Sequence, residues 1–469
     1  MDKTTELITS YATTLRYSDL TPEAVHCTKR SFIDTFGCAI GGAEGESSKI
    51  AKKVAGFSSS KFPSRIWGTS DYSSPDMAAF ANTVMVHYLN FDECWRDLPY
   101  SGGFPGRTIP PIVAVGEPAG ATGRDIIAAT VVAYDVCYRL VDQVFTHRLG
   151  WNQAFYTGPA SVAGLANLMR LTPEQTANAL SLSAISALRL RQTRASKMAM
   201  WKACDCADAN RDVVHYAFLA REGLTAPNEA FEGKWGLWHQ AGNLESPLES
   251  DVQLEPFAFS NQSFKVTQMS HKIFPCHNHG LSPISMALEL RDKVKMEEIT
   301  AINIQAYYRA TNALDAGPNK PEKRDPQSRE DADHSIPWLV AVALRDGKVT
   351  SDSFRAESVR DPTLRPLMQK VRVTENPEFT RQFPQAYNMR MEIVDRSGER
   401  QTAARRYPKG YQWDPLTDGE LEQKFITLVE GAVGLKQCRK LLDLLWRLEE
   451  LDTVSPILDA LSAASYRSQ

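Results

Sequence analysis

Lys202 stands where a charged side chain is unexpected. It follows Trp201 at the start of an alanine-rich segment, 203–220, whose small side chains let a helix approach its neighbours closely. Burying an unpaired ammonium in a closely packed helix pair is costly. Two interpretations are open: the side chain extends along its apolar stem to the surface, or its charge binds an anionic ligand.

A Cys-His-Asn-His run at 276–279 is the second candidate for chemistry. Two histidines and a cysteine suggest metal ligands, but a convincing zinc site needs a second ligand pair, which this run lacks. We therefore expect no metal. Histidine titrates near neutral pH, so proton transfer at a domain junction is the better use of these imidazoles.

Two further stretches place polar groups beside glycine. Asp92 and Glu93 precede the glycine-rich segment 102–106, where they could act as a base and its neighbour or lie solvated at a helix end. The segment 149–153, Leu-Gly-Trp-Asn-Gln, is a turn into a helix whose backbone amides could hold a carboxylate. No glycine-rich nucleotide fingerprint follows a strand anywhere in the chain.

The composition is that of an ordinary globular protein, with 43% hydrophobic and 23% charged residues. A net charge of -3 argues against a nucleic-acid partner. The sequence contains no run of about 18 apolar residues, so it predicts no membrane span. The first residues lack the apolar core of a signal peptide, so a cytoplasmic location is expected. The eight cysteines are scattered, which disfavours a disulfide framework or an iron–sulfur cluster.

Helix signals follow one another up to about residue 250. Thr21 and Pro22 form a helix start, Thr122 caps another helix, and Thr172 forms a capping box with Gln175. Gly223 suits the left-handed position that ends a helix. The expected helices include 22–38, 76–90, 126–140 and 153–170. A loop rich in glycine and proline is expected from Trp95 to Pro111.

The pattern changes near residue 250. Period-two alternation, typical of half-buried strands, occurs at 263–266, 301–307, 371–373 and 389–394. Helical segments are expected at 282–293 and 337–345, with Ser335 capping the second and Asp333 and His334 fixing its entry. The expected fold is mostly α with a smaller α+β part. Residues 1–270 and 409–469 form an all-α helical domain, and 271–408 form an inserted α+β lid domain.

Several segments together resemble the MmgE/PrpD family, which includes 2-methylcitrate dehydratases, cis-aconitate decarboxylase and an iminodisuccinate epimerase. The resemblance covers nearly the whole chain. Its most specific pieces are Trp201-Lys202-Ala203, 209–211, 219–223, 232–236, Phe274-Pro275 with His279, and 332–337. It implies an all-α domain built from both chain ends, an inserted lid, a homodimer and an active cleft between the domains. It implies neither a metal nor an organic cofactor.

The resemblance also assigns candidate site residues. Lys202 matches the family's pocket lysine, His279 its lid histidine, and Asp92 lies within its Asp-rich motif. Other positions depart from the family pattern: Asn90 replaces the first acid of that motif, Cys94 its usual threonine, Phe104 a pocket histidine, and Asn152 the histidine that decarboxylases carry after Gly-Trp. These departures disfavour decarboxylation.

The expected function is that of a hydro-lyase acting on a 2-methylcitrate-like or alkylcitrate-like polycarboxylate. Lys202 and Arg107 are the expected carboxylate anchors, and His279 is the base or acid, with Asp92 as a possible partner. Asn90, Cys94, Phe104 and Asn152 complete the expected substrate-binding residues. An apolar Phe104 would suit an alkyl tail. An isomerase or epimerase, a decarboxylase and a non-catalytic relative are the alternatives.

Overall fold

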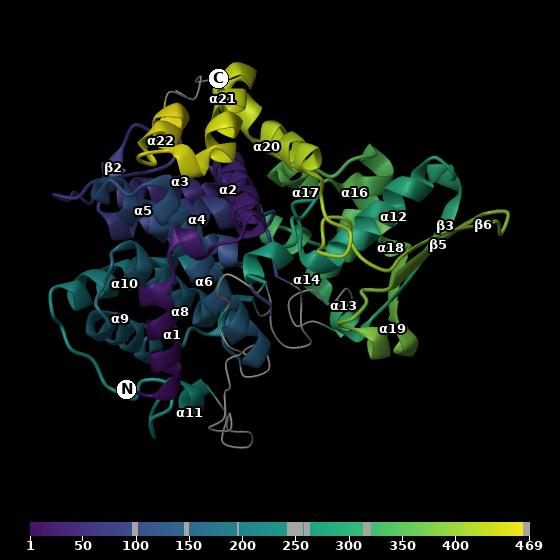
Figure 1. Ribbon diagram of the computed structural model, residues 1–469. Helices are drawn as coiled ribbons and strands as arrows, with labels where there is room; N and C mark the ends of the chain where they lie inside the picture. The colour runs from purple at the N-terminus through teal and green to yellow at the C-terminus, as the bar shows by residue number, and fades with distance from the viewer. Residues whose placement is uncertain are drawn as a thin grey trace.

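The computed structural model describes residues 1–95, 102–144, 150–194, 197–241, 257, 263–312 and 320–462. Helices from both ends of the chain gather on one side, and the segment that carries a four-stranded sheet lies on the other (Figure 1). We call these the helical part (α1–α11 and α20–α22) and the sheet part (α12–α19 and β3–β6). Within the described ranges, no helix has the length and apolar character needed to cross a membrane.

The helical part is built from helices whose starts follow the predicted caps. Thr21 caps α2 with Pro22 in the first turn, Thr172 forms the predicted capping box, and Thr122, predicted as a cap, forms a capping box with Asp125. Its helices are α1 (Lys3–Thr14), α2 (Pro22–Gly42), α3 (Glu46–Ala55), α4 (Pro75–Tyr88), α5 (Ile109–Ala119), α6 (Gly123–Gln143), α8 (Ala154–Leu168), α9 (Pro173–Ile185), α10 (Asp205–Arg221), α11 (Leu237–Ala241), α20 (Asp418–Val433), α21 (Leu435–Trp446) and α22 (Ser455–Ser462). β1 (Ser64–Arg65) and β2 (Tyr72–Ser73) form a small antiparallel pair beside them.

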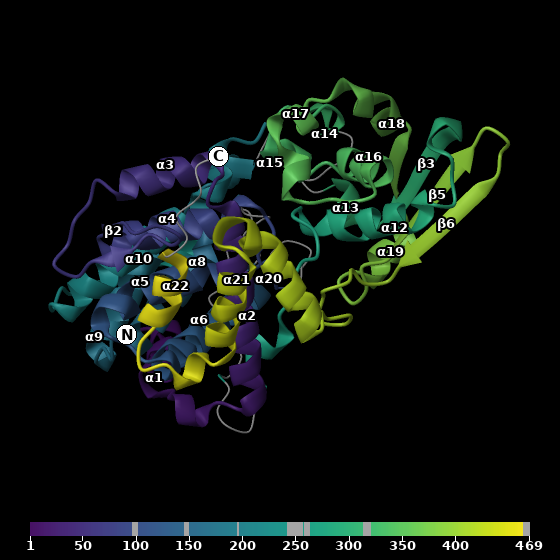
Figure 2. The same ribbon diagram turned by 90° about the horizontal axis from the view of Figure 1, so that it is seen from above.

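The C-terminal helices return to the N-terminal ones, as Figures 1 and 2 show for α20 and α2. Gly41 of α2 permits this close approach, because a Cβ there would lie 2.8 Å from Cδ2 of Leu428 in α20. A single apolar core joins the two chain ends and includes Phe36, Leu89 and Phe425. The chain therefore leaves the core of the helical part after Met269 and returns to it in α20.

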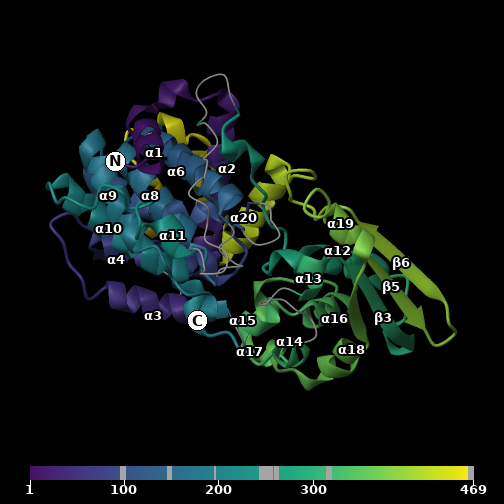
Figure 3. The ribbon, with the colours of Figure 1, turned by 90° about the horizontal axis from the view of Figure 1, so that it is seen from below.

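The sheet part has the strand order β4-β3-β5-β6. β3 pairs with β4 in parallel and with β5 antiparallel, and β5 and β6 form a hairpin. Figure 3 shows the helices of this part gathered beside the sheet. Ser335 caps α16 as predicted, accepting from the backbone N of Trp338 at 3.2 Å. The elements are β3 (Ile299–Ala306), β4 (Val371–Glu375), β5 (Met389–Asp395), β6 (Arg400–Arg405), α12 (Leu281–Arg291), α13 (Tyr308–Asn312), α14 (Pro321–Arg324), α15 (Arg329–Ala332), α16 (Ile336–Asp346), α17 (Ala356–Val359), α18 (Arg365–Gln369) and α19 (Pro377–Gln382).

Three local predictions were wrong. The strand expected at 263–266 is absent, and Lys265–Gln268 forms a short 3₁₀ helix, η5, in which Val266 is buried, as is the preceding Phe264. Strand β6 lacked a clear alternation and was missed. The loop expected up to Pro111 ends earlier, because a 3₁₀ turn, η2 (Pro105–Thr108), leads directly into α5. The expected mostly α fold with a smaller α+β part agrees with these elements.

The two parts have separate apolar cores. The core of the helical part extends along the chain to Met269 and resumes at Leu421. The core of the sheet part begins at Cys276 and ends at Tyr411, and it also takes in Cys94 from the helical part. The domain boundaries at 270/271 and 408/409 stay a prediction.

Candidate functional site

Lys202 lies in a 3₁₀ turn, η4 (Met200–Ala203), just before α10. Its side chain is only 3% exposed, and its Nζ donates to Oδ2 of Asp333 at 2.6 Å. Burial, only partly offset by Asp333, lowers the pKa of Lys202 to about 8. The interpretation that this side chain reaches the surface was therefore wrong. Its charge meets a carboxylate of the sheet part, so this buried ion pair joins the two parts of the molecule.

Asp333 connects Lys202 to a group of histidines. Its Oδ1 accepts a hydrogen bond from Nδ1 of His334, and its backbone oxygen accepts from the backbone N of His277 at 2.8 Å. Burial acts to raise the pKa of Asp333, but Lys202 and His334 hold that pKa well below its usual value. Burial also lowers the pKa of His334 to about 4. Asp333 is therefore a carboxylate, and His334 a neutral imidazole, at neutral pH.

The histidines continue the network to His279. The ring centroid of His277 lies 4.7 Å from that of His334 and 4.7 Å from that of His279. Nδ1 of His279 is 2.8 Å from the hydroxyl of Tyr307, at the end of β3. All three histidines and Lys202 thus belong to one continuous cluster. It brings together the two residues, Lys202 and His279, that the sequence had placed in opposite domains.

The low pKa of His334 predicts acid sensitivity. Between about pH 6.5 and pH 4 the unfolded chain binds a proton that the folded protein does not, so this histidine lowers the free energy of unfolding by about 1.4 kcal/mol for each pH unit of acidification. Urea unfolding at pH 7.5, 6.0 and 5.0 measures the slope. His334→Asn keeps a donor beside Asp333 but does not titrate, so its slope is expected to be shallower. Equal slopes would contradict the assignment.

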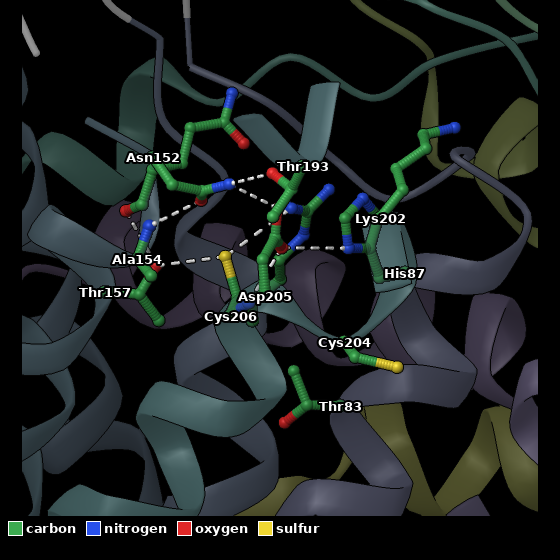
Figure 4. A network of polar contacts seen from close by, with 12 residues as sticks. Thr83, His87, Asn152, Ala154, Thr157, Thr193, Lys202, Cys204, Asp205 and Cys206 are labelled. Atoms are coloured by element: carbon green, nitrogen blue, oxygen red, sulfur yellow. Dashed lines mark hydrogen bonds and ion pairs between the residues drawn. The ribbon is translucent and has the colours of Figure 1, made fainter. Parts of the chain in front are cut away.

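A second polar network lies under η4, where Asp205 begins α10 (Figure 4). Oδ2 of Asp205 accepts from Nδ2 of Asn152 at 2.7 Å and from Nη2 of Arg194 at 3.0 Å. Asn152 also donates to Oγ1 of Thr193 at 2.9 Å, and its Oδ1 accepts from the backbone N of Ala154, the first residue of α8, at 3.0 Å. Asn152 is fully buried. An amide at this position fixes the network but cannot exchange a proton as an imidazole does.

Asp92 and Arg107 form a buried ion pair. Nε and Nη2 of Arg107 donate to the two carboxylate oxygens at 2.8 and 3.3 Å, and Nη1 also contacts Sγ of Cys206 at 3.7 Å. Although burial acts against it, Asp92 holds the pKa of Arg107 above its usual value. The guanidinium lies 4.1 Å from the ring centroid of Phe104. Arg107 thus already binds a carboxylate of its own chain, and its role as a substrate anchor stays a prediction.

Glu93 is also buried, so the interpretation of Asp92 and Glu93 as solvated acids was wrong. The carboxylate of Glu93 accepts from the hydroxyl of Tyr134 and from Oγ of Ser31 at 2.7 Å, and it lies 3.4 Å from Nε2 of His271. These contacts fix the segment that follows α4 against α2 and α6. Cys94, the next residue, is buried and pairs its backbone with Ser270 of the connection to the sheet part.

Lys272 is a site residue that the sequence analysis missed. Its side chain is fully buried, and its Nζ donates to the backbone oxygen of Asn90 at 2.8 Å and to Oδ1 of Asn90 at 3.0 Å. Its Nζ also lies 5.2 Å from the ring centroid of Phe104. Within the described part of the chain, no carboxylate lies within ion-pair distance of this ammonium. A buried cation of this kind suits an anionic ligand.

Six of the eight predicted residues therefore fall into two connected sets, while Asn152 belongs to the Asp205 network and Cys94 pairs its backbone with Ser270. Lys202 and His279 lie at the ends of the Asp333 network, and Asp92, Arg107 and Phe104 form a second set that also contains Asn90 through Lys272. Sequence reasoning missed Asp333, His334 and Lys272 as site residues. The charge run before α16 was a visible signal, but helix capping explained it. In the described ranges, no group of three or more metal-ligating side chains is placed to hold a metal ion.

Comparisons with known proteins point to one family across most of the chain. The family model described as MmgE/PrpD N-terminal domain matches residues 6–247, and the one described as MmgE/PrpD C-terminal domain matches residues 274–449. The mitochondrial 2-methylcitrate dehydratase of Yarrowia lipolytica is 24% identical over 381 residues, 77% of this chain and 70% of the relative. The 2-methylcitrate dehydratase of Escherichia coli is 24% identical, covering 75% and 73%. The cis-aconitate decarboxylase of Homo sapiens is 23% identical, covering 96% and 93%.

Proposed function

The chain belongs to the MmgE/PrpD family, and on that premise we propose that it is a hydro-lyase, a dehydratase of a 2-methylcitrate-like or alkylcitrate-like hydroxy polycarboxylic acid. Relatives named 2-methylcitrate dehydratase support the reaction class. The observation that supports the proposal is the buried network from Lys202 through Asp333, His334 and His277 to His279, because it links a cation of the helical part to an imidazole of the sheet part.

In the proposed reaction, cations bind the carboxylates of the substrate and an imidazole transfers a proton. A polycarboxylate needs positive charge to replace its hydration, and the buried ammonium groups of Lys202 and Lys272 would supply it. His279 transfers a proton during elimination, with the hydroxyl of Tyr307 holding its ring through Nδ1. The Asp92–Arg107 pair lies against Phe104, whose ring centroid is 5.2 Å from Nζ of Lys272. No metal or organic cofactor takes part in this scheme.

Asn152 favours dehydration over decarboxylation in this chain. Its amide is buried and fully committed to Asp205, Thr193 and the start of α8. It cannot act as a proton donor or acceptor in turnover in the way that a histidine can. The relative named cis-aconitate decarboxylase therefore supports the fold and the family more than the reaction.

The apolar ring of Phe104 indicates which substituent the substrate carries. Its ring lies between two cations, 4.1 Å from the guanidinium of Arg107 and 5.2 Å from Nζ of Lys272, and it packs against the core of the sheet part. An aromatic ring at this position offers an apolar surface where the family carries an imidazole. We therefore expect an alkyl substituent on the polycarboxylate, and a longer chain to be accepted as well as a methyl group.

A substrate panel tests the proposed reaction. The purified protein is incubated with 2-methylcitrate, a longer alkylcitrate and cis-aconitate, and enoate absorbance and carbon dioxide are followed. We expect an enoate from at least one of the two citrates and no carbon dioxide from cis-aconitate. Carbon dioxide release would replace dehydration with decarboxylation. Loss of substrate stereochemistry without an enoate would indicate an epimerase, and no change in any acid would leave a non-catalytic relative.

A homodimer is part of the same proposal. On α3 and just after it, Ile50, Val54 and Phe57 expose 51%, 41% and 77% of their surface at helical spacing, which forms an apolar stripe. Such a stripe is suited to a second copy of the chain. Light scattering should then give twice the 52.2 kDa of one chain, and a single-chain mass would refute the dimer. A cytoplasmic location likewise belongs to the proposal.

A further inference from the structure

His87 is a buried histidine to which the scheme above gives no role. It lies in the last turn of α4 and is only 1% exposed. Neither of its ring nitrogens has a hydrogen-bond partner in the described part of the chain. Figure 4 shows one nitrogen turned toward Asp205, whose Oδ1 lies 3.6 Å from Nδ1 of His87, and the other turned away from it. Buried polar atoms in native proteins are almost always satisfied, so this imidazole needs an explanation.

Charged groups from several elements surround His87. Burial, together with the positive charges of Arg107, Arg194, Lys202 and Lys272, holds the pKa of His87 well below its usual value. These four cations come from η2, the 3₁₀ turn η3 (Arg191–Arg194), η4 and the segment before α12. The carboxylate of Asp205 at the start of α10 opposes them. His87 is therefore neutral, the form of an imidazole that can accept a proton.

A bound polyanion would change this balance. Its carboxylates would neutralise the surrounding cations, which are the groups that oppose a positive charge on His87. The imidazolium that forms would then have Asp205 beside Nδ1 and the substrate beside Nε2. The ring thus becomes a stronger base only when a polycarboxylate is present. A histidine that served packing alone would need neither an unpartnered nitrogen nor four cations around it.

We propose that His87 is a further catalytic residue, the base that removes the proton from the substrate carbon, and that Asp205 is the residue that positions its ring. This inference rests on the proposed dehydratase function. The C–H proton moves to Nε2 of His87, and the C–H electron pair forms the second bond of the carbon–carbon double bond. The C–O bond breaks, and the hydroxyl leaves as water with a proton from His279. Solvent then returns the proton from His87 to His279.

Kinetics of His87→Gln test the catalytic step. Glutamine keeps a polar group of similar length but does not take up a proton, so we expect kcat to fall at least about 10²-fold, with KM changed by less than about threefold. His215→Gln, at an exposed position of α10, is the control and should keep wild-type rates. Circular dichroism checks that both variants fold. If His87→Gln does not fold, His87→Asn is measured in its place. A wild-type kcat in the folded His87 variant would overturn the proposal.

Nuclear magnetic resonance of ¹⁵N-histidine-labelled protein separates this inference from the proposed function. Tricarballylate, a tricarboxylate without the leaving hydroxyl, is the probe. We expect it to raise the pKa of one histidine signal by at least about one unit, and the signal to be missing in His87→Gln. If the wild type dehydrates none of the acids, the dehydratase proposal fails, and the histidine signal alone then tests the role of His87. An unchanged His87 signal at saturating tricarballylate overturns the inference.

Discussion

Replacing His279 with glutamine is expected to lower kcat between about 10²- and 10⁴-fold while KM changes by less than about threefold. The imidazole stands at the end of the buried network, 2.8 Å from the hydroxyl of Tyr307 through Nδ1. Glutamine preserves polarity and approximate length but cannot carry a proton through a catalytic cycle. Initial rates of enoate formation from 2-methylcitrate or the longer alkylcitrate provide the measurement.

Two companion variants show whether the loss of activity in His279→Gln is specific to the proton transfer by His279. Tyr307→Phe removes only the hydroxyl that holds the ring, so a smaller loss of kcat is expected than for His279→Gln. His239→Gln changes an exposed histidine of α11 and should leave the kinetics unchanged. If His279→Gln is folded and turns over at the wild-type rate, His279 transfers no proton and the proposed scheme is wrong.

Replacing Lys202 with methionine is expected to damage both activity and stability. Methionine fills similar volume but leaves Asp333 buried without its cation, which should lower the free energy of unfolding by about 3–5 kcal/mol. Because Lys202 is the proposed carboxylate anchor, its loss should also lower kcat/KM at least about 10²-fold. Urea unfolding and initial rates measure the two effects. Lys234→Met, at an exposed position, is the control for removing a positive charge.

The double variant Lys202→Met/Asp333→Asn separates the two roles of Lys202. It removes both charges of the ion pair, so no unpaired carboxylate stays buried, and much of the lost stability should return. Activity should not return, because the cation that binds substrate is still missing. Recovery of kcat/KM in the double variant would show that Lys202 acts only by neutralising Asp333, and the anchoring role would be rejected.

Local sequence signals predicted much of the helical part. The caps at Thr21, Thr122 and Thr172 depend on side chains within three residues of one another, so a short window contains all the information they need. The segment at 263–266 shows the limit of the same approach. Phe264 and Val266 are both buried, which reproduces the alternation of a strand, although the backbone turns as a 3₁₀ helix from Lys265 onward.

The site could be predicted only in part, because its contacts join distant positions. Lys202 and Asp333 are 131 residues apart, and Lys272 and Asn90 are 182 residues apart. Hydrophobic periodicity cannot identify such pairs. The family resemblance did single out Lys202 and His279, which the structure links through Asp333 and the histidines. His87 lies within a helix of largely apolar residues, where its spacing resembles that of a core position. Its unpartnered nitrogens are visible only in three dimensions.

Tricarballylate binding measured by calorimetry tests most directly whether Lys202 anchors a polycarboxylate where the two parts of the molecule meet. The ligand carries the carboxylates of the proposed substrates and cannot lose water, so binding is separated from turnover. We predict one site per chain in the wild type and at least about a 10²-fold higher Kd in the folded Lys202→Met/Asp333→Asn variant. Equal affinity in the two proteins, or no binding to the wild type at millimolar ligand, would contradict this assignment.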